Sequence, residues 1–363
     1  MRSFVPFGAL WAMPIEIPYS LLVKDGDLAW TCGQVALDGA SRVVAPGDLA
    51  GQTEVVCDYV EEILRLGALP ANAIAKLVLY YVSRDDGDRD RMMAVCRARF
   101  GDRPVMVPIA VPYFYYDGLL LEVDVFASVG RGRVIEKSDD TGSVRMVDGG
   151  ELVWASMTVA AGRLGEAENL LASALDDLDL ENSDRISDHW VAAIGDADGS
   201  DVATTAETLR RMMLISDEGA LIEGAAGHDA LVGELTYARG PREAAAVSSR
   251  DVSDVRVVTR RKGRFDWVSA RCLDGGLGLV EQTSRLMAVL DQTLRELGLT
   301  FENVVKSTSH YVGGGSPDEL HDNMAVRNRS YKKPGPASTG LPVLGLADRN
   351  SRIAIDILAT RRA

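Results

Sequence analysis

The chain carries the same order of hydrophobic and polar patterns three times. Each time, a β-rich run with a central tryptophan comes first, at residues 28–34, 152–158 and 265–271. The tryptophans Trp30, Trp154 and Trp267 lie 124 and 113 residues apart. This spacing fits a whole globular domain per repeat, because solenoid units are only about 20 to 50 residues long. The pattern predicts three copies of one domain of about 120 residues.

An amphipathic helix is predicted after each tryptophan run. Apolar residues recur at helical spacing over 56–64 in the first copy and over 286–294 in the third. Both predicted helices begin near a Gln-Thr pair and stop at a glycine, Gly67 or Gly298, that can cap a helix end. The second copy offers residues 170–178 without such a glycine, so it is the most diverged.

A β-rich run, a short helix and a closing strand complete each predicted copy. The runs cover 75–82, 187–194 and 305–312, the short helices 90–100, 206–213 and 320–330, and the closing strands 119–126, 230–237 and 352–358. This order predicts an α/β (α+β) fold with helices on one face of a mixed sheet. Gly, Arg, Ser and Asp collect at 128–143 and 239–253, which indicates domains at 1–130, 143–240 and 252–363.

Composition and charge narrow the classes of function. At 363 residues, with 47% hydrophobic and 25% charged residues, the chain can form two or three compact domains. No apolar run of about 18 residues is present, and two prolines interrupt the apolar start, so we expect neither a membrane span nor a signal peptide and predict a cytoplasmic location. The formal charge of -14 disfavours nucleic acid as a partner, because Lys and Arg supply most of that affinity.

The four cysteines indicate neither metal nor disulfide chemistry. Cys32, Cys57, Cys96 and Cys272 have no C-x-x-C spacing and no nearby histidine pair. We therefore predict reduced thiols, no metal site and no organic cofactor.

Short segments spread over about 110 residues of the first copy resemble one protein family in their order. They are Pro18-Tyr19-Ser20, Thr31-Cys32-Gly33-Gln34, Gln52-Thr53, Leu66-Gly67, residues 100–104 and Leu121-Glu122-Val123-Asp124. This order resembles the RidA/YjgF superfamily, small trimeric proteins whose best-known members hydrolyse reactive enamines and imines. The third copy is similar through Gln282-Thr283, Leu297-Gly298, residues 336–340 and Ile355-Asp356-Ile357. The second copy is assigned to the family only because it is one of the three repeats.

The resemblance implies a pseudo-trimer within one chain. Trimers of this family form a barrel-like core from three sheets, with small-molecule clefts between neighbouring subunits. Three fused copies would hold three inequivalent clefts, each free to diverge as symmetry would forbid in a homotrimer. The expected state is a monomer or a dimer of such pseudo-trimers.

The resemblance also implies candidate site residues. Family deaminases bind a substrate carboxylate with an arginine in a Pro-x-Arg-Thr-like segment, but Met106 and Ser338 stand at the expected positions here. Tyr19 and Glu122 match a tyrosine and a glutamate of the family's cleft, and Glu122 could act as a general acid/base if partial burial raises its pKa. Alternatively, Tyr19 packs at a domain edge and Glu122 pairs with a surface cation.

A weaker similarity links the third copy to chorismatases, enzymes with two divergent domains of this fold. It involves residues 311–314, Arg327 or Arg329, and residues 336–342. It favours the cleft between the third and first copies as the site. That cleft would hold catalytic Glu122 and Tyr19 and the substrate-binding residues Arg271, His310, Arg327, Ser338, Thr339 and Cys32. His310 could titrate near neutral pH, or it could simply occupy a solvent-facing strand position; His189 reads as a surface or loop residue.

Two hypotheses about function follow. The first is an enzyme of specialised metabolism that acts on an imine, enamine or enol-ether carboxylate by general acid/base chemistry, as a hydrolase, deaminase or chorismatase-like enzyme with an anionic small-molecule substrate. The alternative is a non-catalytic binding or scaffold protein that has lost the family arginine. The aromatic cluster at 112–118 could line a ligand mouth or cap a seam between domains.

Overall fold

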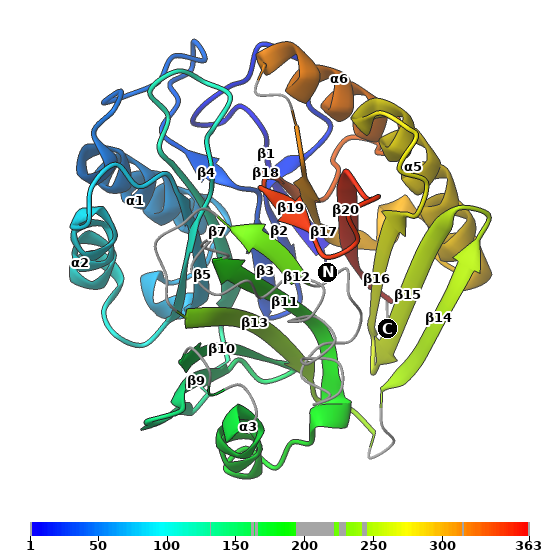
Figure 1. Ribbon diagram of the computed structural model, residues 1–363. Helices are drawn as coiled ribbons and strands as arrows, with labels where there is room; N and C mark the ends of the chain where they lie inside the picture. Colours follow the sequence, from blue (N-terminus) through cyan, green and yellow to red (C-terminus); the bar gives the residue numbers. More distant parts are fainter. Residues whose placement is uncertain are drawn as a thin grey trace.

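Three mixed β-sheets, one from each third of the chain, surround a shared centre in the computed structural model, and the helices lie on the outside (Figure 1). The structure describes residues 2–130, 132–160, 163, 166–193, 221–224, 230–241, 245–313 and 316–361. A central group of buried apolar residues draws on all three sheets, including Trp30, Trp154 and Phe265. The protein is therefore an α+β protein of three repeats that share one core.

The first repeat contains one seven-stranded sheet and two helices. Its elements are β1 (Arg2–Pro6), β2 (Ser20–Asp25), β3 (Leu28–Thr31), β4 (Gln34–Val35), α1 (Leu49–Leu66), β5 (Ile74–Tyr81), α2 (Asp88–Phe100), β6 (Val105–Ala110) and β7 (Leu121–Ser128). The strand order is β1-β2-β3-β7-β5-β6, with β4 also paired to β7. Only β5 and β6 are parallel, and α2 makes the crossover between them.

The second and third repeats have the same strand order. The second has β8 (Val134–Asp139), β9 (Gly142–Asp148), β10 (Leu152–Ala160), α3 (Ala167–Asp176), β11 (Arg185–Ala193), β12 (Leu221–Gly224) and β13 (Ala230–Ala238). The third has β14 (Ala246–Val252), β15 (Val255–Lys262), β16 (Phe265–Cys272), α5 (Leu279–Glu296), β17 (Val304–Tyr311), α6 (Pro317–Asn328), β18 (Ala337–Pro342), β19 (Gly345–Leu346) and β20 (Ile353–Thr360). Across each sheet, the three strands of a meander come first, and the closing strand lies beside the third of them. The two parallel strands lie on the other side of the closing strand.

The structure confirms most predicted elements. The predicted helices of the first and third copies and the three closing strands form close to the expected positions. The segments 128–143 and 239–253 contain β8 and β14, the first strands of the next two sheets. The predicted helix at 206–213 lies outside the described residues, and the division into three domains stays a prediction.

The Gln-Thr pair at the start of each long helix has a structural role. Gln52 is buried in α1; its side chain donates to the carbonyl oxygen of Gly118 and accepts from the backbone N–H of Leu120, at 2.7 and 2.8 Å. Gln282 in α5 makes the equivalent bonds to Asn350 and Arg352. These bonds fix the loop that leads into each closing strand, because buried polar groups must be paired. In the first repeat they fix the start of β7.

The repeats contact one another in a cyclic order. β6 packs against β9 and β10, β11 against β15 and β16, and β18 against β2 and β3. The short strand β19 of the third repeat pairs with β12 of the second and so extends the neighbouring sheet. Each repeat therefore offers the same edge to the next one, as in a closed head-to-tail ring.

Three carboxylates from equivalent positions of the closing strands meet near the centre of this ring. They are Asp124, Glu234 and Asp356, and each pairs with a cation of a neighbouring repeat. Lys306 Nζ lies 2.7 Å from Asp124, His189 Nε2 lies 2.8 Å from Asp356, and Lys76 pairs with Glu234. We call these six residues the central ring.

The central ring is pseudo-symmetric rather than symmetric. Lys76 and Lys306 occupy equivalent positions, opposite Phe126 and Leu358 in the register of their sheets. Ser187 takes this position in the second repeat, and His189, two residues further along β11, supplies the cation. A step of two residues keeps a side chain on the same face of a strand, so a different residue can complete the ring.

Replacing Lys306 with methionine should destabilise the fold strongly. The variant leaves the Asp124 carboxylate buried without its cation, which costs about 3–5 kcal/mol of unfolding free energy. Urea unfolding followed by circular dichroism measures the change. Lys332→Met, which removes an exposed pair with Glu302, is the control and should leave the unfolding midpoint nearly unchanged. Equal effects of the two substitutions would contradict a structural role for the central ring.

Candidate functional site

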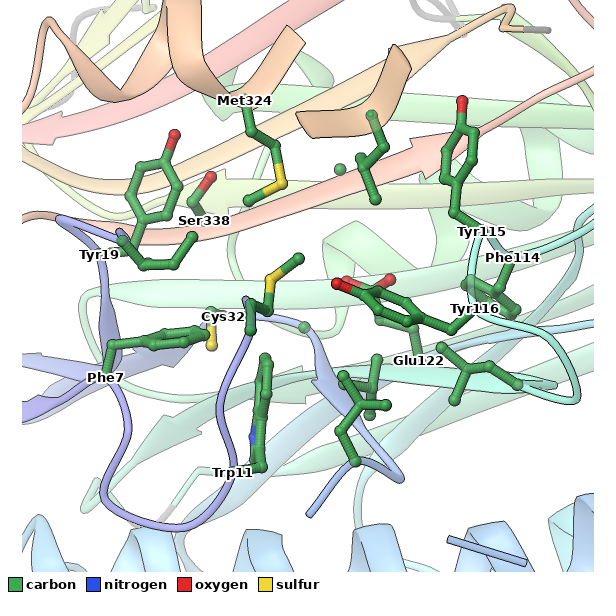
Figure 2. A pocket seen from close by; sticks show the side chains of 18 of the residues that line it. Phe7, Trp11, Tyr19, Cys32, Phe114, Tyr115, Tyr116, Glu122, Met324 and Ser338 are labelled. Carbon is green, nitrogen blue, oxygen red and sulfur yellow. The ribbon is translucent and has the colours of Figure 1, made fainter. Parts of the chain in front are cut away.

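A cleft of about 700 Å³, including its open mouth, lies between the first and third repeats (Figure 2). The first repeat contributes the segment between β1 and β2, the turn after β3 and the aromatic loop before β7. The third repeat contributes α6 and β18.

Glu122 reaches into this cleft from β7. Its carboxyl group lies against the backbone of Gly33, where an added Cβ atom would stand only 1.7 Å from Oε1, so a residue other than glycine would displace it. Burial, reinforced by the negative charge of Asp124, raises the pKa of Glu122 to about 8. No cation in the described part of the chain forms an ion pair with Glu122, so the expected alternative of a surface pair is wrong. The group is largely protonated at neutral pH.

Arg327 supplies a guanidinium to the same cleft from α6. Its Nε donates to Asn323 Oδ1 at 3.1 Å and its Nη1 to Ser309 Oγ at 2.9 Å. Nη2 lies beside Gly340 in the cleft lining and has no hydrogen-bond partner among the residues described. Arg327 is only 2% exposed, and no described carboxylate lies within ion-pair distance. Because a buried cation without a counter-charge is costly, the site is complementary to an anion.

Tyr19, Ser338 and Cys32 also line the cleft, as predicted (Figure 2). Burial raises the pKa of Tyr19, whose ring packs edge-to-face on Tyr331 with centroids 5.4 Å apart. Burial likewise raises the pKa of the Cys32 thiol, and the Gln34 amide donates to its sulfur and its carbonyl oxygen. Cys32 is therefore a neutral wall residue rather than a thiolate nucleophile.

Three predicted substrate-binding residues lie elsewhere. Thr339 points behind the cleft, where its hydroxyl contacts Lys306 and Asp124 of the central ring. His310 is buried at the centre with its ring 5.2 Å from that of His189, so neither the predicted cleft position nor the solvent-facing alternative is correct. Arg271 lies buried on β16, the strand that packs against the second repeat.

The sequence analysis missed the N-terminal wall of the cleft. Phe7 and Trp11 meet edge-to-face, with centroids 4.7 Å apart, and the Trp11 indole N–H donates to Gln34 Oε1 at 3.0 Å. The sequence pattern of this apolar segment argues only against a signal peptide and does not predict a place in the cleft. The aromatic loop fulfils both proposed roles: Phe114 lines the cleft, while Tyr113 donates to the carbonyl oxygen of Gly313 in the third repeat at 3.1 Å.

A second group of possible metal ligands combines His189 and Asp356 of the central ring with the neighbouring His310. The donor atoms of His189, His310 and Asp356 all lie within 4.8 Å of one another. Burial alone would lower the pKa of His189, but pairing with Asp356 and Glu234 outweighs it and raises the pKa to about 10. Burial and the charge on His189 lower the pKa of His310 to about 4. With His189 charged, the ring has three cations for its three carboxylates, and a divalent metal displacing that proton would leave excess positive charge. The geometry favours an ion pair over a metal centre.

The fold and the cleft define a three-repeat α+β protein with a partly polar, partly apolar cleft between its outer repeats. Over about a third of its length, this chain is similar to proteins of the RutC (RidA/YjgF) family. It is 28% identical over 111 residues to RutC family proteins of Pyrococcus horikoshii and Pyrococcus abyssi; the match covers 30% of this chain and 86% and 85% of those proteins. No protein-family model matches the chain.

Similar solved structures also cover about a third of this chain. A YjgF family member from Mycobacterium tuberculosis is 22% identical with a TM-score of 0.29, covering 36% of this chain and 100% of that one. RidA from an Antarctic Psychrobacter is 17% identical with a TM-score of 0.31, covering 35% and 99%. None of the helices in the described ranges has the length and apolar character needed to cross a membrane.

Replacing His189 with glutamine should remove a pH-dependent contribution to the free energy of unfolding. Because the pKa of His189 is raised on folding, its stabilising contribution is complete below about pH 6.5 and is lost as the pH rises through about 10. The wild type should exceed the variant by about 3 kcal/mol at pH 6, and the difference should shrink towards pH 10. Urea unfolding at several pH values measures it. A difference that stays constant with pH would show that His189 is not a charged member of the central ring.

Proposed function

We propose that the cleft between the first and third repeats binds a carboxylate-bearing imine or enamine and hydrolyses it. One observation carries the proposal: a protonated, unpaired Glu122 and a buried Arg327 without a counter-ion line the same cleft. Burying each group without a partner costs free energy when no ligand is bound. Together the two groups complement a ligand that has a carboxylate and a basic nitrogen. Similarity to the RutC family over about a third of the chain agrees with this reaction class.

Glu122 is proposed as the group that moves protons. Its carboxyl proton passes to the imine nitrogen, and the carboxylate formed then accepts a proton from the attacking water as the water oxygen bonds to the imine carbon. Glu122 returns this proton to the nitrogen when the carbon–nitrogen bond breaks, and ammonia leaves. The hydroxyl proton of the intermediate then passes to the Glu122 carboxylate as the carbonyl group forms, which regenerates the acid. A pKa of about 8 suits both directions of transfer near neutral pH.

Arg327 is proposed as the carboxylate anchor. In the resemblance described above, an arginine on the strand that holds Ser338 would have this task. Here the guanidinium comes from α6, beside that strand at Gly340. Arginine suits the role because its planar group forms paired hydrogen bonds to a carboxylate.

The register of the closing strands restricts the proposal to one cleft. Glu122 lies opposite Tyr80 in the first sheet. The equivalent residues are Ala354 in the third repeat, opposite His310, and Val232 in the second, opposite Val191. Neither alanine nor valine can transfer a proton, so the equivalent clefts lack this chemistry.

Glu122→Gln should lower the rate of imine hydrolysis by about 10²–10⁴-fold, because glutamine cannot donate or accept the proton. The substrate is a 2-imino acid generated in place by an amino-acid oxidase, and product is followed as 2-oxo acid released in competition with semicarbazide trapping. The wild-type rate should fall as the pH rises through about 8, where Glu122 ionises.

Glu54→Gln, which changes an exposed carboxylate on the outer face of α1, is the matched control and should keep full activity. Unchanged turnover in Glu122→Gln would remove Glu122 from the mechanism. A wild type that binds carboxylates but releases no product would favour the non-catalytic binding protein instead.

Arg327→Gln should raise KM for a carboxylate substrate at least about tenfold, because the buried anion loses its counter-charge. Steady-state kinetics separates this effect from kcat, and Arg327→Lys should restore part of the loss. Arg329→Gln changes an exposed arginine two residues away and serves as the control. A variant with lower kcat at constant KM would contradict the role of Arg327 as an anchor.

A further inference from the structure

Most of the side chains that line the cleft around its reactive groups are apolar. Phe7, Trp11 and Met13 line it from the N-terminal segment, Phe114 from the aromatic loop, and Leu320 and Met324 from α6. Among the described lining residues, Arg327 supplies a positive charge and Glu122 a carboxyl group. The cleft therefore combines these two groups with a mainly apolar, aromatic lining.

The aromatic wall is fixed before any ligand binds. Trp11 is only 3% exposed, its ring contacts Phe7, and its indole N–H is held by Gln34. Figure 2 shows Trp11 and Met324 on opposite walls of the cleft. Methionine packs well against aromatic rings, because its thioether is polarisable and its side chain adapts to shape.

The mouth is closed on one side by a contact between repeats. The Tyr116 hydroxyl lies 3.3 Å from His321 Nε2, which connects the aromatic loop of the first repeat to α6 of the third. Both walls of the apolar region thus keep a fixed separation. A slot with fixed aromatic walls suits a flat, rigid group better than a flexible chain, because less entropy is lost on binding.

We infer that the ligand is an aromatic carboxylate, an imine or enamine acid whose side chain ends in an aromatic ring. The inference rests on the proposed function for Glu122 and Arg327, and it adds the chemical class of the ligand's side chain. A two- or three-carbon substrate would reach Arg327 and Glu122 but would make no contact with the apolar lining at Trp11 and Met324. An aromatic side chain packed against that lining is itself removed from water, which is the main source of affinity in such pockets.

Binding of stable carboxylates tests the inference without any turnover. Isothermal titration calorimetry on the full chain should show that 3-phenylpropionate binds at least about thirtyfold more tightly than propionate. Trp11→Ala should weaken 3-phenylpropionate at least about tenfold and propionate less than about twofold. Arg327→Gln should weaken both, since both carry the carboxylate. Val247→Ala, at an exposed apolar residue of β14, is the matched control and should change neither affinity.

A second variant protects the test against misfolding. If thermal unfolding shows that Trp11→Ala is not folded, Met324→Ala replaces it, with the same expected loss for 3-phenylpropionate alone. Equal affinity of the wild type for propionate and 3-phenylpropionate would overturn the inference, as would equal losses for both ligands in the folded variant.

The outcomes separate the two proposals. Tight and selective binding of 3-phenylpropionate, together with full activity in Glu122→Gln, would support the ligand class and reject the mechanism. Hydrolysis that depends on Glu122, without preference for an aromatic side chain in binding, would support the mechanism and reject the ligand class.

Discussion

The cyclic charge pairing at the centre of the molecule is the constraint on which the rest of the structure depends. Each of the three carboxylates is buried and takes its counter-charge from another repeat. Removing one partner leaves an uncompensated buried charge, so the three repeats are stable only when they are assembled in this order. The apolar core around the ring has no such directionality, since the hydrophobic effect does not specify which edge meets which.

The central ring also positions the strands that form the cleft. Lys306 holds Asp124 at 2.7 Å and the Thr31 carbonyl oxygen at 3.0 Å, which ties the third repeat to the strands that carry the first half of the site. Glu122 precedes Asp124 by two residues and therefore shares its face of β7. One of these carboxyl groups is paired and the other is not. The charge on the first helps to keep the second protonated, so structural and reactive roles are coupled along a single strand.

Local patterns in the sequence predicted the elements, but not the contacts that build the site. The helices could be predicted because their apolar spacing and glycine ends act within one segment, as in α1 and its end at Gly67. Tyr19 and Glu122 could be placed in the cleft through resemblance to a family. The pairing of Lys306 with Asp124 joins residues 182 positions apart, and the arginine that lines the cleft, Arg327, comes from α6 rather than from the strand on which the resemblance implied an arginine. Contacts of this kind depend on how the repeats pack together, so no local pattern in the sequence predicts them.

Fusion explains why the repeats could diverge and also where divergence stops. In a homotrimer every change at the position of Glu122 would appear three times, whereas here Ala354 and Val232 occupy the other two positions. The ring tolerates less change, because a carboxylate without a cation cannot remain buried. The second repeat shows this limit directly: it has Ser187 in place of the lysine, and His189 at the next position on the same face restores the charge. A carboxyl group of the cleft can therefore disappear from a repeat, while the charge at its centre must be replaced.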